Sequence, residues 1–300
     1  MRKERIFRIK NRDCILGRRT WIMGILNVTP DSFSDGGLFL DREKAVDHGM
    51  RMVDEGADII DIGGESTRPG SEPTPSKEEL KRVIPVLSAF KKKSGVPVSV
   101  DTQKADVASA VLDEGADIIN DISALRNDPD MLPLLAGRQA TVILMHMKGT
   151  PKTMQVRPCY QDVLAEVGSF LGERIRAATE KGLDAQRIVL DPGIGFGKRF
   201  EDNLNLIRNL NRLEILERPI LMGISRKSFI GRILDAPADE RLEGTIAAAV
   251  LSMVRGAHIL RVHDVGAVRK AVAVAEAIMG DSAGGESESA NPELKTEHAG

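Results

Sequence analysis

The stretch DEGADII occurs twice in this chain, at Asp54–Ile60 and again at Asp113–Ile119. In both copies a glycine follows two acidic residues, and an Ala-Asp pair then leads into two isoleucines. A glycine in this position is typical of the left-handed residue that ends a helix, so Gly56 and Gly115 predict two helix ends. The isoleucines predict that a buried strand begins after each turn. The chain therefore repeats one helix-turn-strand unit.

The same unit recurs on both sides of these two copies. Short β-branched and aliphatic runs alternate with longer segments of helical period, an order that predicts a parallel sheet with helices outside it. The predicted strands are Trp21–Asn27, Ile59–Gly63, Val96–Asp101, Ile118–Asp121, Thr141–His146, Ile188–Asp191, Ile220–Ile224 and Ile259–His263. A helical segment follows each strand, and eight such units predict an α/β fold closed into a single (β/α)8 TIM barrel.

Two of the predicted helices can be located by residue. After the seventh strand, apolar residues recur at helical spacing and predict the face that packs on the barrel; they are Ile246, Ala249, Val250, Met253 and Val254. Ahead of the third strand, Ser76 is followed three residues later by Glu79. This pair predicts a capping box and therefore the start of a helix at this point.

The two ends of the chain depart from the barrel pattern. Residues 1–18 form an N-terminal extension in which Ile6–Leu16 alternates apolar and polar residues around Asn11–Asp13. A hairpin that plugs the lower end of the barrel and an ordinary surface arm both fit this pattern. Residues 19–280 are assigned to the barrel. Residues 281–300 are polar and contain no aromatic residue, so they predict a disordered tail.

The composition of the 300 residues disfavours several classes of function. Apolar residues make up 42% and charged residues 29%, and 42 basic against 44 acidic residues leave no excess charge to attract nucleic acid or an anionic membrane. Cys14 and Cys159 are far apart and predict free thiols in a reducing compartment, hence a cytoplasmic protein. No apolar run approaches the roughly 20 residues of a membrane span, and no export signal is recognisable.

Polar residues end every predicted strand, and active sites of this fold lie at the carboxyl ends of the strands. These residues are Asn27, Asp61, Asp101, Asn120, Asp121, His146, Asp191, Ser225, Arg226, Lys227, Arg261 and His263. They predict a mouth that is acidic at depth and basic to one side. The acidic set is Asp101, Asn120 and Asp191, and the basic set is Arg68, Lys227, Arg261 and His263. Such a mouth suits a ligand with a guanidine-like edge at one end and an anion at the other.

Seven motifs lie at these strand ends, at the spacing of barrel units. They read MGILNVTPDSFSDGG at Met23–Gly37, DIGGESTRPG at Asp61–Gly70, VSVDTQK at Val98–Lys104, INDIS at Ile119–Ser123, DPGIGFG at Asp191–Gly197, GISRKSFIG at Gly223–Gly231 and RVHDV at Arg261–Val265. In this order they resemble the dihydropteroate synthase family of pterin-binding barrels over nearly the whole chain except its ends. The resemblance implies a transferase of folate biosynthesis that condenses hydroxymethyl-dihydropterin pyrophosphate with p-aminobenzoate and releases pyrophosphate.

The resemblance implies that four residues bind the pterin, namely Asp101, Asn120, Asp191 and Lys227. A carboxylate can accept hydrogen bonds from the adjacent amine and ring N–H of an aminopyrimidinone edge, and an amide can both donate and accept. For Asp101 and Asp191 the competing interpretation is helix capping just past a strand. For Lys227 it is a solvated loop lysine.

The anion end of the ligand is assigned by the same resemblance to Asn27, Thr67, Arg68, Arg261 and His263, with Mg²⁺ held mainly by Asn27 and phosphate oxygens. The residues implied in catalysis are Arg68, Lys227, Arg261 and His263. Taken alone, His263 would more often be a surface or packing histidine, and its role depends on Arg261 two residues away. His146 is undecided between core, supporting and ligand roles.

The p-aminobenzoate ring is assigned by the resemblance to Phe33, Pro69, Phe196 and Ser228. Two of these residues lie in the loops 31–37 and 64–71, whose composition suits mobile lids. The resemblance also implies a homodimer through outer helices, which the small residues Ala247–Ala249 permit. Two other functions stay open. They are a pterin-binding methyltransferase barrel with a corrinoid partner, and a non-catalytic pterin-binding protein.

Overall fold

The computed structural model describes residues 2–29 and 37–280. Within them lie the barrel strands β3 (Trp21–Asn27), β4 (Ile59–Gly63), β5 (Val98–Asp101), β6 (Ile118–Asp121), β7 (Thr141–Met145), β8 (Ile188–Asp191), β9 (Leu221–Gly223) and β10 (Ile259–Val262). They form one eight-stranded parallel sheet in the order β8-β7-β6-β5-β4-β3-β10-β9. A parallel bridge between Leu190 in β8 and Ile220 beside β9 joins the two edges. The predicted eight-stranded α/β barrel is therefore confirmed, and it is nearly closed.

The bounds of the strands agree closely with the sequence prediction. Strands β3, β4, β6 and β8 begin and end at the predicted residues, and the ends of β7, β9 and β10 differ by one residue. The largest difference is in β5, predicted from Val96 and observed from Val98. Pro97 has no N–H to donate to a strand ladder, and only its carbonyl is used, as the acceptor for the Ile60 N–H at 3.1 Å.

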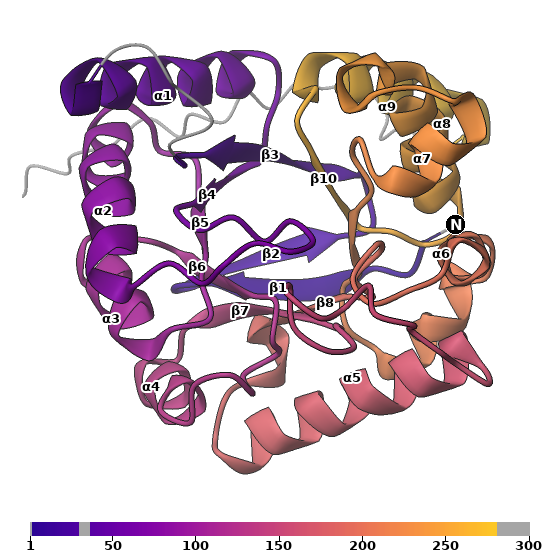
Figure 1. Cartoon of the computed structure of the whole chain (residues 1–300), viewed down its shortest axis with the longest axis horizontal. Helices are drawn as coiled ribbons and strands as arrows, with labels where there is room; N and C mark the ends of the chain where they lie inside the picture. The colour runs from indigo at the N-terminus through magenta and orange to yellow at the C-terminus, as the bar shows by residue number, and fades with distance from the viewer. Residues whose placement is uncertain (1, 30–36, 281–300) are drawn as a thin grey trace, which may run out of the picture.

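A ring of helices surrounds the barrel (Figure 1). These are α1 (Gly37–Asp54), α2 (Ser76–Lys93), α3 (Ala105–Asp113), α4 (Met131–Arg138), α5 (Val163–Glu180), α6 (Phe200–Arg208), α7 (Ser228–Leu234), α8 (Leu242–Val254) and α9 (Val265–Met279). The repeated unit is confirmed, because α1 and α3 both end at the first residue of a DEGADII copy. Gly56 and Gly115 have φ angles of +97° and +105°, which only glycine adopts without strain.

The predicted capping box at the start of α2 is wrong, although the helix does begin at Ser76. The N-cap is Pro75, and no side chain caps the first turn. Glu79 is instead fully buried, and its carboxylate lies 2.6 Å from Lys104 Nζ. A charge-assisted pair replaces the weaker bond that Glu79 would make to a neutral backbone N–H.

The buried face of α8 is close to the predicted one, because Ile246 and Val250 are partly buried and pack against the core. Ala249 and Met253 are buried as expected, but Val254 is 49% exposed. The remaining buried residues of α8 are the small side chains Thr245, Ala248 and Ser252. Small side chains let the helix approach its neighbours closely, and they complete the inner face beside the predicted residues.

The N-terminal extension is a hairpin of β1 (Arg5–Ile9) and β2 (Arg12–Leu16), paired antiparallel. Phe7, Ile9 and Leu16 are buried in one cluster with the inward-facing residues Met23, Ile59, Ile118, Ile143, Val189, Leu221 and Ile259. The hairpin therefore plugs the amino-terminal end of the barrel, and the surface-arm alternative is wrong. The predicted tail at 281–300 lies outside the described residues. Among the residues described, no helix is both long enough and apolar enough to cross a membrane.

Replacing Phe7 by alanine should lower the free energy of unfolding by about 3–5 kcal/mol, because a fully buried ring that closes the barrel would leave a cavity. Urea denaturation followed by circular dichroism measures the change. The matched control is Ile6→Ala on the opposite face of β1, where the side chain is 44% exposed. An equally small effect of both substitutions would show that the hairpin does not close the end of the barrel.

Candidate active site

The carboxyl ends of the barrel strands surround a cavity of about 690 Å³. The predicted site residues that line it are Asn27, Thr67, Arg68, Pro69, Asp101, Phe196, Lys227, Ser228, Arg261 and His263. A smaller recess beside it adds Asn120 and Asp191 and shares Asp101, Lys227 and Arg261 with the main cavity. The fold thus brings together every predicted site residue except Phe33, which lies outside the described residues.

The floor of the site is acidic and buried. Asp101 and Asp191 are inward-facing ends of β5 and β8, and burial raises the pKa of both carboxyl groups. Arg261 opposes this rise, and its Nη2 donates to Asp101 Oδ2 at 3.3 Å. Asp191 Oδ1 accepts from the Gly193 N–H at 2.7 Å. The helix-capping alternative does not describe Asp101, because the N-cap of the following helix is Lys104.

Asp61 also belongs to the floor, although its place in the sequence assigned it no ligand. Its side chain is fully buried, and Oδ2 accepts from Arg261 Nε at 2.6 Å and from Asn120 Nδ2 at 3.1 Å. One carboxylate therefore orients two predicted site residues that come from β6 and β10. The alternation of side chains along β4 predicts that Asp61 faces the barrel interior. The sequence does not predict which residues its carboxylate contacts.

The other wall of the site is basic. Lys227 Nζ lies 4.2 Å from the centroid of the Phe196 ring, and burial lowers the pKa of Lys227 to about 8. Burial also lowers the pKa of His263 to about 4, so the ring is neutral at pH 7 in the free protein. Ser225 Oγ lies 3.0 Å from His263 Nδ1 and orients the ring.

Two further residues line the cavity, Arg241 and Gln155. They were not predicted from the sequence, because neither follows a strand.

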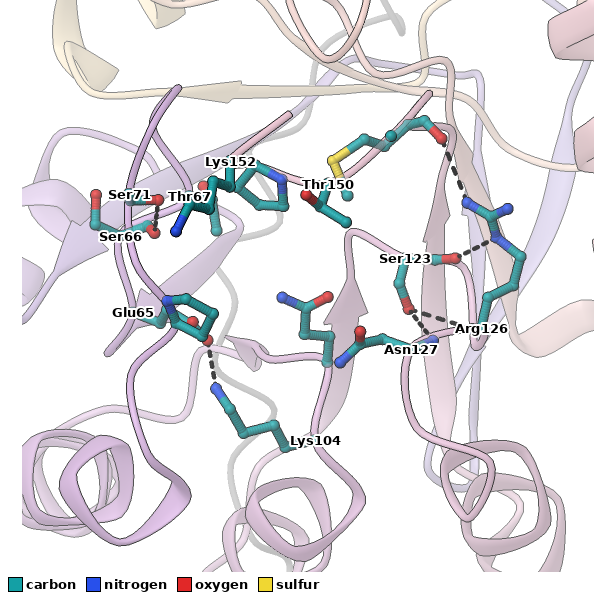
Figure 2. A pocket seen from close by; sticks show the side chains of 15 residues that line it. Glu65, Ser66, Thr67, Ser71, Lys104, Ser123, Arg126, Asn127, Thr150 and Lys152 are labelled. Atoms are coloured by element: carbon teal, nitrogen blue, oxygen red, sulfur yellow. Dashed lines mark hydrogen bonds and ion pairs between the residues drawn. The ribbon is translucent and has the colours of Figure 1, made fainter. Parts of the chain in front are cut away.

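The loop after β4 carries Thr67, Arg68 and Pro69 and is held by several bonds. Ser71 Oγ lies 2.6 and 2.8 Å from the carbonyl oxygens of Ser66 and Arg68, which share its one hydrogen, and the Gly70 N–H donates to the Pro151 carbonyl at 3.0 Å. Glu65, at the start of the loop, pairs with Lys104. A neighbouring cavity has a volume of about 390 Å³ and shares Glu65, Ser66 and Thr67 with the main one, so this loop forms a wall between the two. Figure 2 shows the side chains that line this second cavity.

Two of the strand-end polar residues point away from the cavity. Asp121 is buried, and its carboxylate accepts from the backbone N–H groups of Ser123 and Leu125 at 2.7 and 2.9 Å. His146 is 5% exposed, and its ring packs edge-on against Phe170 at a centroid distance of 4.8 Å. Of the three roles left open for His146, the structure favours a buried one behind the site.

These features define a parallel barrel with a polar cavity at the carboxyl ends of its strands, and residues 23–263 match the family described as pterin binding enzyme. The chain is 47% identical over 263 residues to dihydropteroate synthase of Synechocystis sp.. The aligned region covers 87% of this chain and 91% of that protein. It is 46% identical over 261 residues to dihydropteroate synthase of Bacillus subtilis, and the aligned region covers 87% of this chain and 89% of that protein. The chain belongs to the dihydropteroate synthase family.

Solved structures agree with this assignment. Dihydropteroate synthase of Xanthomonas albilineans with 4-aminobenzoic acid superimposes with a TM-score of 0.86 at 46% identity, over 92% of this chain and 99% of that chain. The same enzyme in complex with 7,8-dihydropteroate gives a TM-score of 0.80 at 42% identity, over 91% of this chain and 98% of that chain. The resemblance expected from the seven motifs is therefore confirmed.

Proposed function

We propose that this chain condenses hydroxymethyl-dihydropterin pyrophosphate with p-aminobenzoate, giving dihydropteroate and pyrophosphate in folate biosynthesis. The observation that carries the proposal is the placement of two carboxylates, the largely buried Asp101 and the buried Asp191, beside a wall of cationic side chains lining the main cavity and the recess next to it. A pterin-binding methyltransferase has no need for such a wall. Incubating the purified protein with both substrates and Mg²⁺ tests the function through release of pyrophosphate and dihydropteroate. Intact pterin binding without product would favour a non-catalytic pterin-binding protein.

The pterin lies against the acidic floor in this proposal. Its amine and ring N–H donate to Asp101 or Asp191, and Asn120 pairs with a remaining donor or acceptor of the ring. The hydrogen bond from Asn120 Nδ2 to Asp61 supports this role, since it fixes the orientation of the amide. Lys227 lies over the Phe196 ring at 4.2 Å and is placed between the pterin and the p-aminobenzoate pocket.

The pyrophosphate is placed at Asn27, Thr67, Arg68, Arg261 and His263, all of which line the cavity. Asn27 fits a magnesium ligand, because it offers a hard oxygen and Gly63 leaves the space before it open: a Cβ at Gly63 would lie 3.5 Å from Asn27 Oδ1. In the described part of the chain, no three His, Cys, Asp or Glu side chains form a metal cage. Mg²⁺ would therefore be held by Asn27 and phosphate oxygens, and would supply stabilisation of the leaving pyrophosphate.

Catalysis in this proposal is mostly electrostatic. Arg68, Arg261 and His263 face the negative charge that grows on the departing pyrophosphate, and an anion beside His263 raises the pKa of that ring. Asp101 and Asp191 stabilise positive charge on the dihydropterin ring. The aryl amine of p-aminobenzoate is a neutral nucleophile at pH 7, so the site has to position it rather than deprotonate it.

The p-aminobenzoate is placed against Pro69 and Phe196, with Ser228 near its carboxylate, and these three residues line the cavity. Ser228 is the first residue of α7. Phe33, the fourth residue expected here, lies outside the described residues.

The free thiols Cys14 and Cys159 support a cytoplasmic location as part of the proposal.

A homodimer through the outer helices is part of the proposal, but its supporting residues differ from those expected. Ala248 and Ala249 are buried in the fold, so the stripe Ala247–Ala249 is not free to form an interface. Helices α7, α8 and α9 lie next to one another (Figure 1). Large apolar side chains are exposed on them instead: Ile233, Leu234, Leu251, Val254, Val274 and Ile278. Exposed apolar residues on adjacent elements are typical of a subunit interface.

Replacing Leu251 and Val254 together by glutamate should raise the dimer dissociation constant by about 100-fold, because an interface there would bury two unpaired charges. Analytical ultracentrifugation of the wild type and of Leu251→Glu with Val254→Glu measures the change. Replacing the exposed Val156, in the loop before α5, by glutamate is the control. A dimer that persists in the double variant would place the interface elsewhere.

A further inference from the structure

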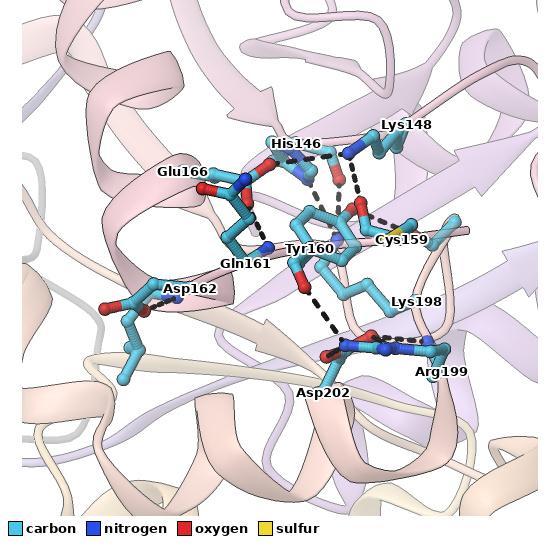
Figure 3. A network of polar contacts seen from close by, with 12 residues as sticks. His146, Lys148, Cys159, Tyr160, Gln161, Asp162, Glu166, Lys198, Arg199 and Asp202 are labelled. Atoms are coloured by element: carbon cyan, nitrogen blue, oxygen red, sulfur yellow. Dashed lines mark hydrogen bonds and ion pairs between the residues drawn. The ribbon is translucent and has the colours of Figure 1, made fainter.

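A buried lysine that the mechanism does not use follows the loop carrying Phe196. Lys198 is 3% exposed, and its Nζ lies 2.9 Å from His146 Nδ1, 3.1 Å from the Phe196 carbonyl oxygen and 3.3 Å from the His146 carbonyl oxygen (Figure 3). One side chain thus joins the end of β7 to the backbone of a residue that lines the active cavity.

The three acceptors match the three hydrogens of an ammonium group, whereas a neutral amine has only two to donate. Burial lowers the pKa of His146 to about 2, so the imidazole is neutral and its Nδ1 can accept. Burial also lowers the pKa of Lys198 to about 7, and the nearby Asp191 opposes this change. The charge of Lys198 therefore depends on the contacts that surround it, among them the neighbouring charges of Asp191, Lys227 and Asp202.

The loop between β8 and α6 also fits closely against the chain that follows β7. A Cβ at Gly193 would lie 2.0 Å from the His146 carbonyl oxygen, and one at Gly197 would lie 2.3 Å from the Lys148 carbonyl oxygen. Tyr160 Oη donates to the Gly197 carbonyl at 2.7 Å. The close approach therefore requires glycine at both positions, and Lys198 holds the backbone of Phe196 between them.

We propose that Lys198 is a positioning residue, which with His146 as its acceptor fixes the Phe196 ring in the p-aminobenzoate pocket and so sets the affinity for that substrate. The inference rests on the proposed function, because it assigns the surface of Phe196 to p-aminobenzoate. Lys198 itself touches neither substrate. Its effect passes through the Phe196 carbonyl, which it holds at 3.1 Å.

Steady-state kinetics of Lys198→Met test the proposal, since methionine keeps much of the side-chain length and removes all three bonds. The KM for p-aminobenzoate should rise about tenfold, while the KM for the pterin pyrophosphate and the kcat should each change less than about threefold. His146→Leu should repeat this pattern. His146→Asn keeps a polar acceptor near the position of Nδ1 and should restore a KM within about threefold of wild type. The two His146 variants keep the proposal testable if Lys198→Met fails to fold.

His258→Leu is the matched control for lost stability. His258 is also buried, at 2% exposure, but it accepts from the Ile220 N–H at the opposite end of the barrel. It should lower the melting temperature without changing either KM. An equal rise of both KM values in Lys198→Met and His146→Leu, or a loss of kcat alone, would overturn the positioning role. A wild type that forms no dihydropteroate would instead refute the proposed function.

Discussion

Asp191→Asn is expected to weaken binding of the dihydropterin by about 10- to 100-fold, and Asp101→Asn by a similar factor. A hydrogen bond to a charged acceptor is worth about 1.5–3 kcal/mol, and about 1.4 kcal/mol is a factor of ten in affinity. Asparagine keeps the shape of the side chain but turns a donor toward the donors of the pterin edge. Calorimetric titration with an unreactive pterin measures the loss.

Asp121→Asn is the matched control for this prediction. Asp121 is also a buried aspartate at the end of a barrel strand, but its carboxylate binds the N–H groups of Ser123 and Leu125 instead of facing the cavity. The substitution should lower stability and leave pterin affinity within about threefold of wild type, because it removes only local bonds. Retained affinity in both Asp101→Asn and Asp191→Asn would show that the pterin binds elsewhere.

The pH dependence of pterin affinity adds a second measurement on the same residue. Burial raises the pKa of Asp191 in the free protein. The carboxylate is the form that accepts from the pterin, so affinity should fall as the pH is lowered through that raised pKa. Asp191→Asn has no proton to gain at this position and should lose this part of the pH dependence. An unchanged pH profile would assign the titration to another group.

Arg261→Met is expected to have the largest effect, on stability and on activity together. Arg261 Nε lies 2.6 Å from Asp61 Oδ2, and Asp61 is fully buried. Removing the guanidinium leaves that carboxylate without its cationic partner, which should lower the free energy of unfolding by about 3–5 kcal/mol. It also removes one cation from the basic wall of the cavity, where the pyrophosphate is placed, so kcat/KM should fall by about 1000-fold.

A second substitution separates these two effects. Adding Asp61→Asn to Arg261→Met removes the unpaired charge, so the double variant should recover about 2 kcal/mol of the lost stability. Activity should stay low, because the cation is still missing from the cavity. Urea denaturation and the pyrophosphate-release assay give the two readings on the same preparations. Full stability of Arg261→Met alone would show that Asp61 does not depend on the guanidinium.

The sequence determined the features that a few neighbouring residues decide. Strands β3, β4, β6 and β8 have the predicted bounds, because an aliphatic run and the polar residue or glycine that ends it are local signals. Gly56 and Gly115 mark helix ends for the same reason. The carboxyl ends of parallel strands meet at one end of a barrel, so a list of strand-end residues was already close to a list of cavity residues.

The tertiary structure alone decided which buried charges meet. Asp61, Asn120 and Arg261 lie on β4, β6 and β10, and β4 stands two strands away from each of the others in the sheet. Only the curvature of the barrel brings the inward-facing Asp61 within reach of both. Glu79 matched a local capping signal, yet it turned toward Lys104 because a buried ion pair is stronger than one neutral cap. Lys198 has no local signal for its partners, because two of its acceptors belong to His146, which directly follows β7. Periodicity specifies which side of an element is buried, whereas the partner of a buried charge depends on residues far away in the chain.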